Sequence, residues 1–302
     1  MSSARAGTLR ERAAGRLWAS LPDVRGRDRL VGLVRGRAPA DPSRPVRGQL
    51  TNGVRFSFPE GSDGSVRALI PLQYAPPALA PVLETLLVAG DCCYDVGANI
   101  GLYALWAARL VGPAGEVHAF EPVPRTAALL ASFVSQNAAD NVRVVQAAVG
   151  ASGGTVSLAT VPGASGLAQV AATGEVSAPM TTLDAYARRH RPPRLVKIDV
   201  EGHEVAVLAG ARELLAEQRP AVVCEVIQRN LASSGATADD VRAELARSGY
   251  EVYCLTRRGL RPWAGGTHPT SDNVLALHPE VGWHRAAAEA LRSRRFSRNQ
   301  TV

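Results

Sequence analysis

The segment CCYDVGANIGLYALWAARLV, residues 92–111, reads as a strand, a turn and a helix in direct succession. CCYDV (92–96) is a short apolar run, and residues 100–110 are apolar at helical spacing. Gly97 and Gly101 bracket the turn, where glycine lets a backbone approach a ligand and lets the next helix pack closely. A helix N-terminus at this point offers free amides and a positive dipole end. The segment therefore predicts the ligand-binding end of an α/β fold.

The same alternation of strands and helices continues down the chain. We expect strands at 92–96, 116–122, 142–149, 194–200, 221–227, 251–257 and 273–278, and helices at 100–110, 125–137, 183–190, 205–217 and 236–248. Strand–helix repetition with short links predicts a doubly wound, mostly parallel α/β sheet of seven strands. The last two strands have no room for a helix between them, so we expect an antiparallel hairpin at one edge. Residues 150–180 are expected to add a short strand pair, and 53–70 a hairpin.

Charge divides the chain of 302 residues into three parts. The net charge is +7, yet residues 1–50 alone carry eleven Arg and four acids, and residues 281–302 carry +4. The remainder, 51–280, is therefore mildly acidic at −4. We predict a basic N-terminal extension and linker (1–50), one catalytic domain (51–280, core 80–278) and a basic C-terminal helix or tail (281–302).

Composition and patterning exclude several classes of protein. No apolar run is long enough for a transmembrane helix, and the N-terminus lacks the apolar core of a secretory signal. Residues 1–20 can form a basic amphipathic helix, for which packing on its own domain is favoured over contact with a membrane surface. The four Cys lie in apolar runs without metal-ligand spacing, which indicates reduced thiols and a cytoplasmic protein. An acidic central domain with no interleaved basic and aromatic residues predicts no nucleic-acid partner.

An acid at the end of the second strand indicates the kind of ligand. Glu121 lies twenty residues beyond Gly101, a placement suited to the two hydroxyls of a ribose. Asp95 stands at the mouth of the glycine turn, whose spacing is GxxxG, and a carboxylate there would repel a pyrophosphate. It would attract a ligand with an ammonium and a sulfonium group. The pattern favours S-adenosylmethionine over NAD, although Asp95 as a helix N-cap is the structural alternative.

With these residues in place, the chain resembles the FkbM family of S-adenosylmethionine-dependent methyltransferases. The resemblance rests on DVGANIGLYAL, GEVHAFEPVP, TTLDAY and LVKIDVEGHEVAVLAGA, in that order, and covers about residues 80–278. It implies a class I methyltransferase (Rossmann-like) fold and methyl transfer to a hydroxyl of a small-molecule acceptor, a sugar or natural product, often in specialised metabolism. The cofactor residues that it implies are Asp95, Gly97, Asn99, Gly101 and Glu121.

The turn after the fourth strand carries the catalytic candidates, Lys197, Asp199, Glu201 and His203. Lys197 and Asp199 alternate along the strand, so their side chains share one face. Transfer to a hydroxyl needs a base, for which His203, Glu201 and Lys197 all remain open. Lys197 is the single lysine among 34 basic residues. Its presence is explained either by chance or by a site that needs a compact amine.

Two further possibilities concern metal and reaction type. Asp199 and Glu225 follow neighbouring strands, where two carboxylates could share one Mg²⁺ with substrate oxygens and water. N-methylation of an amino sugar is the nearest alternative reaction, and a dinucleotide-dependent oxidoreductase is the alternative from another class. Residues 150–180, the N-terminal segment and residues 258–272 are expected to form loops at the sheet edges that select the acceptor.

Overall fold

The structure is a computed structural model that describes residues 45–59, 69, 71–73, 76–161, 164–170, 174–256, 258–266, 269, 272–294 and 296. The helix expected at 1–20 and the linker residues before 45 lie outside these ranges. No helix among the described residues has the length and apolar character needed to cross a membrane.

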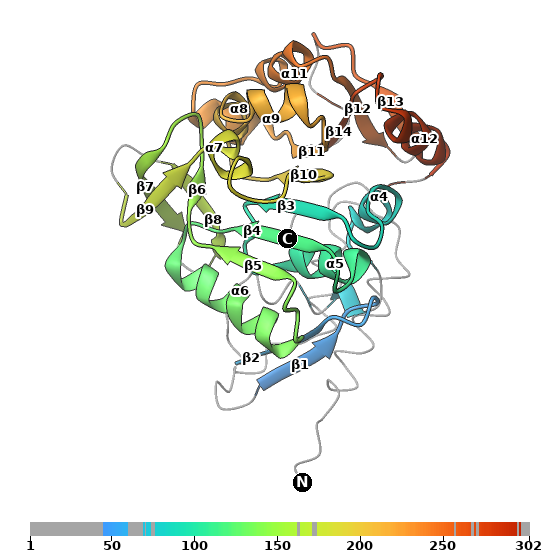
Figure 1. The fold of residues 1–302 in the computed structure, drawn as a ribbon. Helices are drawn as coiled ribbons and strands as arrows, with labels where there is room; N and C mark the ends of the chain where they lie inside the picture. Colours follow the sequence, from blue (N-terminus) through green and yellow to red (C-terminus); the bar gives the residue numbers. More distant parts are fainter. Residues whose placement is uncertain are drawn as a thin grey trace, which may run out of the picture.

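A mixed sheet forms the centre of the molecule (Figure 1). Its eight strands run in the order β13-β12-β14-β11-β10-β3-β4-β5. Their bounds are β3 Cys92–Val96, β4 Glu116–Phe120, β5 Val142–Val145, β10 Leu195–Ile198, β11 Ala221–Glu225, β12 Glu251–Thr256, β13 Gly259–Pro262 and β14 Asn273–Leu277. The strands β5, β4, β3, β10 and β11 are parallel, whereas β14 is antiparallel to both of its neighbours. The chain reverses its winding direction between β3 and β10, so their carboxyl ends flank the switch point.

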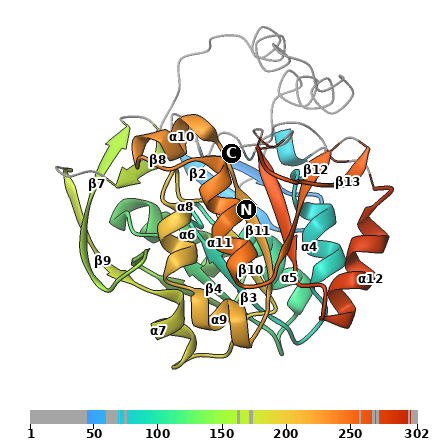
Figure 2. The same ribbon diagram turned by 90° about the horizontal axis from the view of Figure 1, so that it is seen from above.

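Helices cover both faces of this sheet (Figure 2). One core cluster joins the sheet to α4 (Ala80–Leu86), α5 (Leu102–Val111), α6 (Pro124–Gln136) and α12 (Gly282–Leu291). The other cluster joins it to α7 (Leu183–Ala187), α8 (Glu204–Ala209), α9 (Arg212–Glu217), α10 (Gln228–Ser233) and α11 (Ala238–Arg247). Strand β3 shows the alternation that makes this possible, since Cys93 packs on the first side and Tyr94 on the second.

The expected sheet of seven strands needs one correction. Residues 259–262, assigned to a loop from the sequence, form β13 and pair with β12, which makes the sheet eight-stranded. Gly259, with φ of +89°, supplies the left-handed residue that this tight return requires. The two closing strands, β12 and β14, are antiparallel as expected, but β14 lies between β12 and β11 rather than at the edge.

The N-terminal strands extend the prediction. Strand β2 (Arg55–Pro59) pairs with β1 (Pro45–Gln49), so residues 45–48 are strand rather than linker. The second strand of the hairpin expected at 53–70 lies, except for Leu69, outside the described residues. The hairpin packs on the domain, because the Asn137 side chain at the end of α6 accepts from Arg55 N at 2.7 Å and donates to Arg55 O at 2.7 Å.

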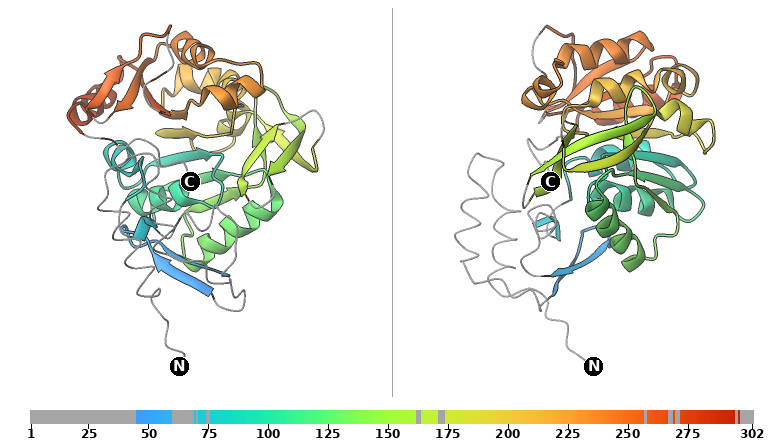
Figure 3. Two further views of the ribbon diagram at one scale, coloured as in Figure 1. Left: turned by 180° about the vertical axis from the view of Figure 1, so that it is seen from behind. Right: turned by 90° about the vertical axis from the view of Figure 1, so that its left-hand side faces the viewer.

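A second, four-stranded sheet stands beside the first (Figure 3). Its order is β6-β9-β7-β8, with bounds β6 Ala148–Val149, β9 Val176–Thr181, β7 Gly154–Val161 and β8 Ala164–Val170. The expected strand 142–149 therefore divides into β5 in the main sheet and β6 in this one. The segment 150–180, expected to hold a strand pair, contributes three strands.

Smaller differences follow local geometry. The helix expected at 205–217 divides into α8 and α9 at Gly210 and Ala211. A Cβ built on Gly210 would lie 2.1 Å from Gly150 O, so this junction requires glycine. Helix α11 begins with a capping box formed by Thr237 and Asp240. A short 3-10 turn, η1, spans Pro71–Gln73. The four cysteines are buried and free, as expected.

Candidate active site

The turn that follows β3 is held tightly against the ends of the neighbouring strands. Gly97, Asn99 and Gly101 have φ of +77°, +49° and +90°. The amides of Gly97 and Ala98 both donate to Phe120 O, at 3.0 and 2.9 Å. A Cβ on Gly97 would lie 1.7 Å from Asp199 O, so this glycine admits the backbone of the β10 turn, whereas the sequence suggested the approach of a ligand. A Cβ on Gly101 would meet Leu130 Cδ1 at 2.2 Å, which confirms its role in helix packing.

Glu121 connects this turn to the end of β4. Its carboxylate accepts hydrogen bonds from Asn99 N at 3.0 Å and Val123 N at 2.9 Å. The side chain is buried, and burial raises the pKa of Glu121 to about 7 against the lowering effect of the two amides. Glu121 thus rests beside the glycine turn, as predicted, and faces a pocket.

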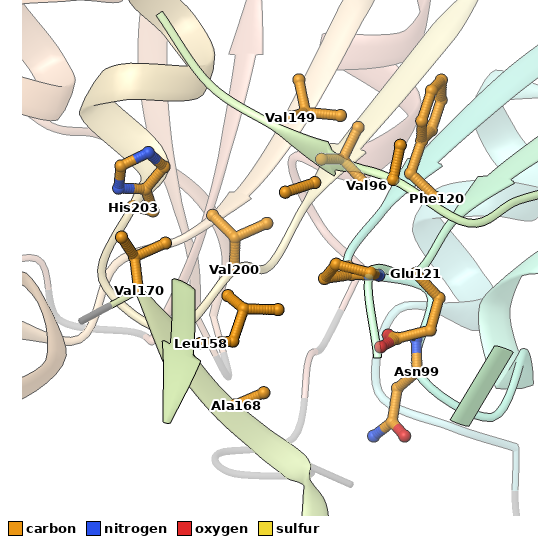
Figure 4. A pocket seen from close by; sticks show the side chains of 14 residues that line it. Val96, Asn99, Phe120, Glu121, Val149, Leu158, Ala168, Val170, Val200 and His203 are labelled. Carbon is orange, nitrogen blue, oxygen red and sulfur yellow. The ribbon is translucent and has the colours of Figure 1, made fainter. Parts of the chain in front are cut away.

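That pocket lies between the carboxyl end of β4 and the strands β7 and β8. One wall comes from the main sheet, with Phe120 and Glu121, and the opposite wall from the second sheet, with Leu158 and Val170 (Figure 4). Apolar walls with one carboxylate at the rim suit a flat aromatic base joined to a ribose. The sequence assigned residues 150–180 to selection of the acceptor, whereas Leu158, Ala168 and Val170 from this segment line the pocket beside Glu121, because the folded chain brings β7 and β8 to the carboxyl ends of β3 and β4.

A second pocket of about 430 Å³ lies on the other side of the glycine turn. Gly97 and Asn99 line both pockets, so the turn forms their shared wall. The polar lining of the second pocket includes Lys197, Asp199 and Glu225, and Tyr103, Asn273 and Leu79 complete much of it. Tyr103 and Asn273 were not candidates at the level of sequence, since each reads there as an ordinary helix or strand residue.

Lys197 is enclosed between two carboxylates. Its Nζ lies 3.0 Å from Asp95 Oδ1 and 3.4 Å from Asp199 Oδ2, and it also donates to Gly97 O at 3.4 Å. Strand register explains the first contact, because Lys197 and Asp95 are direct partners on β10 and β3. Burial would lower the pKa of Lys197, but the two carboxylates outweigh it and raise that pKa. Such an ammonium stays charged, which disfavours Lys197 as the base.

Asp95 accordingly has a different place from the one expected. It is 1% exposed and paired with Lys197, and it lines neither of the two pockets described above. It is not a helix cap either, because the residue before α5 is Gly101.

Three carboxylates gather at the ends of β10 and β11. One oxygen each from Asp199, Glu201 and Glu225 lies within 4.8 Å of the others. Burial and then repulsion from Asp199 raise the pKa of Glu201 to about 7, which the Arg229 charge opposes. Burial, with repulsion from Asp199 and Glu201, raises the pKa of Glu225 strongly. The structure thus unites Glu225 with the block predicted after the fourth strand and adds Glu201 to the expected pair.

The turn that presents Glu201 is itself strained and braced. Glu201 has φ of +53°, an uncommon value for a residue with a side chain. The buried Glu204 accepts from Val200 N and Gly202 N, at 3.2 and 3.1 Å, and so holds the turn closed. Asn230 Nδ2, from α10, donates to Glu201 Oε2 at 2.6 Å and orients its carboxylate.

His203 lies apart from this cluster. It lines the first pocket, opposite Glu121 and close to Val170 and Val149, in Figure 4. Burial lowers the pKa of His203. Its position beside the apolar pocket, rather than beside Asp199 and Glu225, disfavours it as the base.

Comparison with known proteins identifies the family of the chain. The profile described as the methyltransferase FkbM domain matches residues 95–252, just over half of the chain. The hexuronic acid methyltransferase AglP of Haloferax volcanii is 32% identical over 128 residues, which are 41% of this chain and 52% of that protein. The chain therefore matches about half the length of this curated relative.

Solved structures of methyltransferases are also similar. A methyltransferase FkbM from Methylobacillus flagellatus KT aligns with a TM-score of 0.44 at 17% identity, covering 71% of this chain and 54% of that one. An S-adenosylmethionine-dependent O-methyltransferase from Thermotoga maritima aligns with a TM-score of 0.42 at 14% identity, covering 82% and 81%.

Proposed function

The chain belongs to the FkbM family of S-adenosylmethionine-dependent methyltransferases, and on that premise we propose that it methylates a hydroxyl of a sugar or a sugar-containing metabolite. One observation carries this proposal: the cluster of Asp199, Glu201 and Glu225 stands next to the glycine turn, where an acceptor proton must be removed. The similarity to a hexuronic acid methyltransferase supports a sugar as the acceptor. Membership of this methyltransferase family argues against the alternative of a dinucleotide-dependent oxidoreductase.

The two pockets fit the two halves of the methyl donor. We assign the adenosine half to the pocket between Glu121 and Val170, where the buried carboxylate can accept from ribose hydroxyls. The methionine half and the acceptor belong to the pocket lined by Lys197, Asp199 and Glu225. Asn99 lines both pockets. Its buried Oδ1 has no hydrogen-bond partner among the described residues, so a bound donor molecule could supply that hydrogen bond.

The donor supplies an electrophilic methyl group on a sulfonium, and the protein residues supply orientation and a proton acceptor. The acceptor oxygen gains the methyl as its proton passes to a carboxylate, and the carbon–sulfur bond breaks to leave the thioether. Glu201 is the base that we favour, because its pKa of about 7 matches the neutral range and Asn230 fixes its direction. Asp199 and Lys197 keep the turn and the β3 end aligned.

The test is transfer of labelled methyl to a panel of neutral sugars, hexuronic acids and amino sugars. The proposal predicts a methyl ether, which withstands mild alkali. Label released by mild alkali would indicate a carboxyl ester, and label on nitrogen would indicate N-methylation of an amino sugar, for which the acidic pocket is the supporting observation. Either product would overturn the assignment to a hydroxyl.

Location is part of the proposal. Four free thiols, all buried, fit a reducing compartment, and we propose that the enzyme acts in the cytoplasm.

A further inference from the structure

We propose that Asp199, Glu201 and Glu225 bind a divalent cation, Mg²⁺ or Mn²⁺, in the acceptor pocket. Two adjacent strands build the site. Asp199 and Glu201 lie in the turn after β10, Glu225 ends β11, and β10 pairs with β11 in parallel. One oxygen from each of the three carboxylates lies within 4.8 Å of the other two.

Glu225 is the observation that points to a ligand. It is 3% exposed, and it lines the acceptor pocket. Within the described ranges no hydrogen bond or ion pair engages its carboxylate, whereas the similarly buried Glu121 and Glu204 each accept from two backbone amides. A buried carboxylate aimed at two others is costly unless a proton or a cation joins them.

Lys197 is not the cation that joins these three carboxylates. Its Nζ is engaged by Asp95 Oδ1 and reaches only Asp199 among the three carboxylates. If the carboxylates of Asp95, Asp199, Glu201 and Glu225 were all ionised, they would carry a charge of −4. Together with the Lys197 ammonium, the group would have a net charge of −3. A divalent cation removes most of this excess at its centre.

The donor set and the spacing suit a hard cation. Three carboxylate oxygens with open positions for water and acceptor oxygens are the ligands that Mg²⁺ and Mn²⁺ prefer. Ligands about 2.1 Å from an octahedral Mg²⁺ lie about 3.0 Å apart when cis and about 4.2 Å apart when trans, so the three side chains would have to close around the ion from separations of up to 4.8 Å. Asn230 already holds Glu201 by the oxygen Oε2, which leaves Oε1 for the cation.

The role of this cation rests on the proposed function. A metal ion bound to the acceptor hydroxyl would lower the pKa of that hydroxyl, so the oxygen could lose its proton to water at neutral pH, and Glu201 would then serve as a ligand rather than as the base. It would also shield a substrate carboxylate, such as that of a hexuronic acid, from the three acidic side chains.

Binding of Mn²⁺ to the full-length protein, freed of metal by a chelator, tests the site without any measurement of activity. Electron paramagnetic resonance follows the loss of the free Mn²⁺ signal during titration. We expect Glu225→Gln and Asp199→Asn each to weaken Mn²⁺ binding by at least about tenfold. Loss of a residue that only hydrogen-bonds to a metal ligand already lowers metal affinity by about 10–100-fold. Glu217→Gln is the control, because Glu217 is an exposed acid on α9.

Thermal unfolding guards against variants that simply fail to fold. Without metal we expect Glu225→Gln to be at least as stable as the native protein, because a neutral amide replaces a buried carboxyl group that Asp199 and Glu201 repel whenever it ionises. With saturating Mg²⁺ the melting temperature of the native protein should rise and that of Glu225→Gln should not. The site is refuted if the native protein binds no Mn²⁺ at up to about 1 mM, the weak end of carboxylate sites, or if both variants bind as tightly as the native protein.

The two proposals can fail separately. Mn²⁺ binding that requires Glu225, without transfer to any sugar, would retain the metal site and reject the acceptor class. Sugar methylation that is indifferent to chelator, in a protein that binds no Mn²⁺, would retain the function and reject the metal site.

Discussion

At the scale of single residues, Glu121 both closes the glycine turn and faces the proposed adenosine pocket. Glu121→Gln keeps the shape of the side chain but loses the charge that strengthens its hydrogen bonds. We expect the affinity for S-adenosylhomocysteine to fall by about 1.5–3 kcal/mol, roughly 10–100-fold. Calorimetry on the folded variant checks this, and an unchanged dissociation constant would remove Glu121 from the ribose site.

The pKa of Glu121 also predicts a dependence of binding on pH. The ionised carboxylate is the better acceptor for ribose hydroxyls, and the pKa is raised to about 7 in the folded protein. Affinity for S-adenosylhomocysteine should therefore be fully developed above pH 7 and decline as pH falls through 7, by up to about tenfold per unit. In Glu121→Gln this part of the pH dependence should vanish. The same slope in both proteins would assign the titration to another group.

Lys197 gives the sharpest prediction for stability. Lys197→Met removes the ammonium and leaves the buried Asp95 without its partner, which typically costs about 3–5 kcal/mol. Asp95→Asn combined with Lys197→Met should recover much of that loss, because the buried charge is gone. Chemical denaturation of the two single variants and the double variant measures the coupling. Additive effects would mean that the pair contributes no interaction of its own.

At the scale of elements, the turn after β3 and the turn after β10 are packed backbone to backbone. Gly97→Ala should be strongly destabilising, since its Cβ would lie 1.7 Å from Asp199 O. Gly90→Ala is the matched control, with a similar φ of +89° and nothing within 4 Å of its Cβ. It should show only the backbone cost of about 1–2 kcal/mol. Equal melting temperatures for the two variants would contradict the close packing.

The second sheet is expected to act as one wall of the cofactor site. Val170, on β8, lines the adenosine pocket and is 39% exposed, so a polar substitution should leave folding nearly unchanged. Val170→Asp should weaken S-adenosylhomocysteine binding by about tenfold through lost apolar contact and desolvation of the new charge. Val88→Asp is the control, because Val88 is 56% exposed and lines neither pocket. Equal affinities in the two variants would detach β8 from the site.

At the scale of the whole molecule, all four thiols belong to the buried core. Burial raises the pKa of Cys92 to about 12 and those of Cys93 and Cys224 well above their ordinary value. The native protein should therefore react with a thiol reagent only through unfolding, and S-adenosylhomocysteine should slow that reaction by stabilising the folded state. One thiol that reacts rapidly under native conditions would reveal a local opening of the sheet.

The succession of strands and helices along the chain was predictable from local pattern. Apolar runs of strand length, separated by helical periodicity, indicated the doubly wound sheet, and the glycines with Glu121 predict a cofactor site at the carboxyl ends of β3 and β4. The alternation of Lys197 and Asp199 correctly indicated a shared face. These features depend on residues close together in the chain, where periodicity and turn chemistry act directly.

The sequence by itself determined the fold class, the family and the acidic block around Asp199. The tertiary structure decided which partners each of these residues has, and so which role it can take. Strand register buries Lys197 against Asp95, which turns a candidate base into a fixed charge. The course of the chain after β10 places His203 in the pocket beside Glu121 and brings Glu225 close to Glu201, twenty-four positions away in sequence. The wall from β7 and β8 and the strand β13 arise in the same way. A side chain's protonation and partners depend on burial and on long-range neighbours, and these exist only once the sheet has assembled.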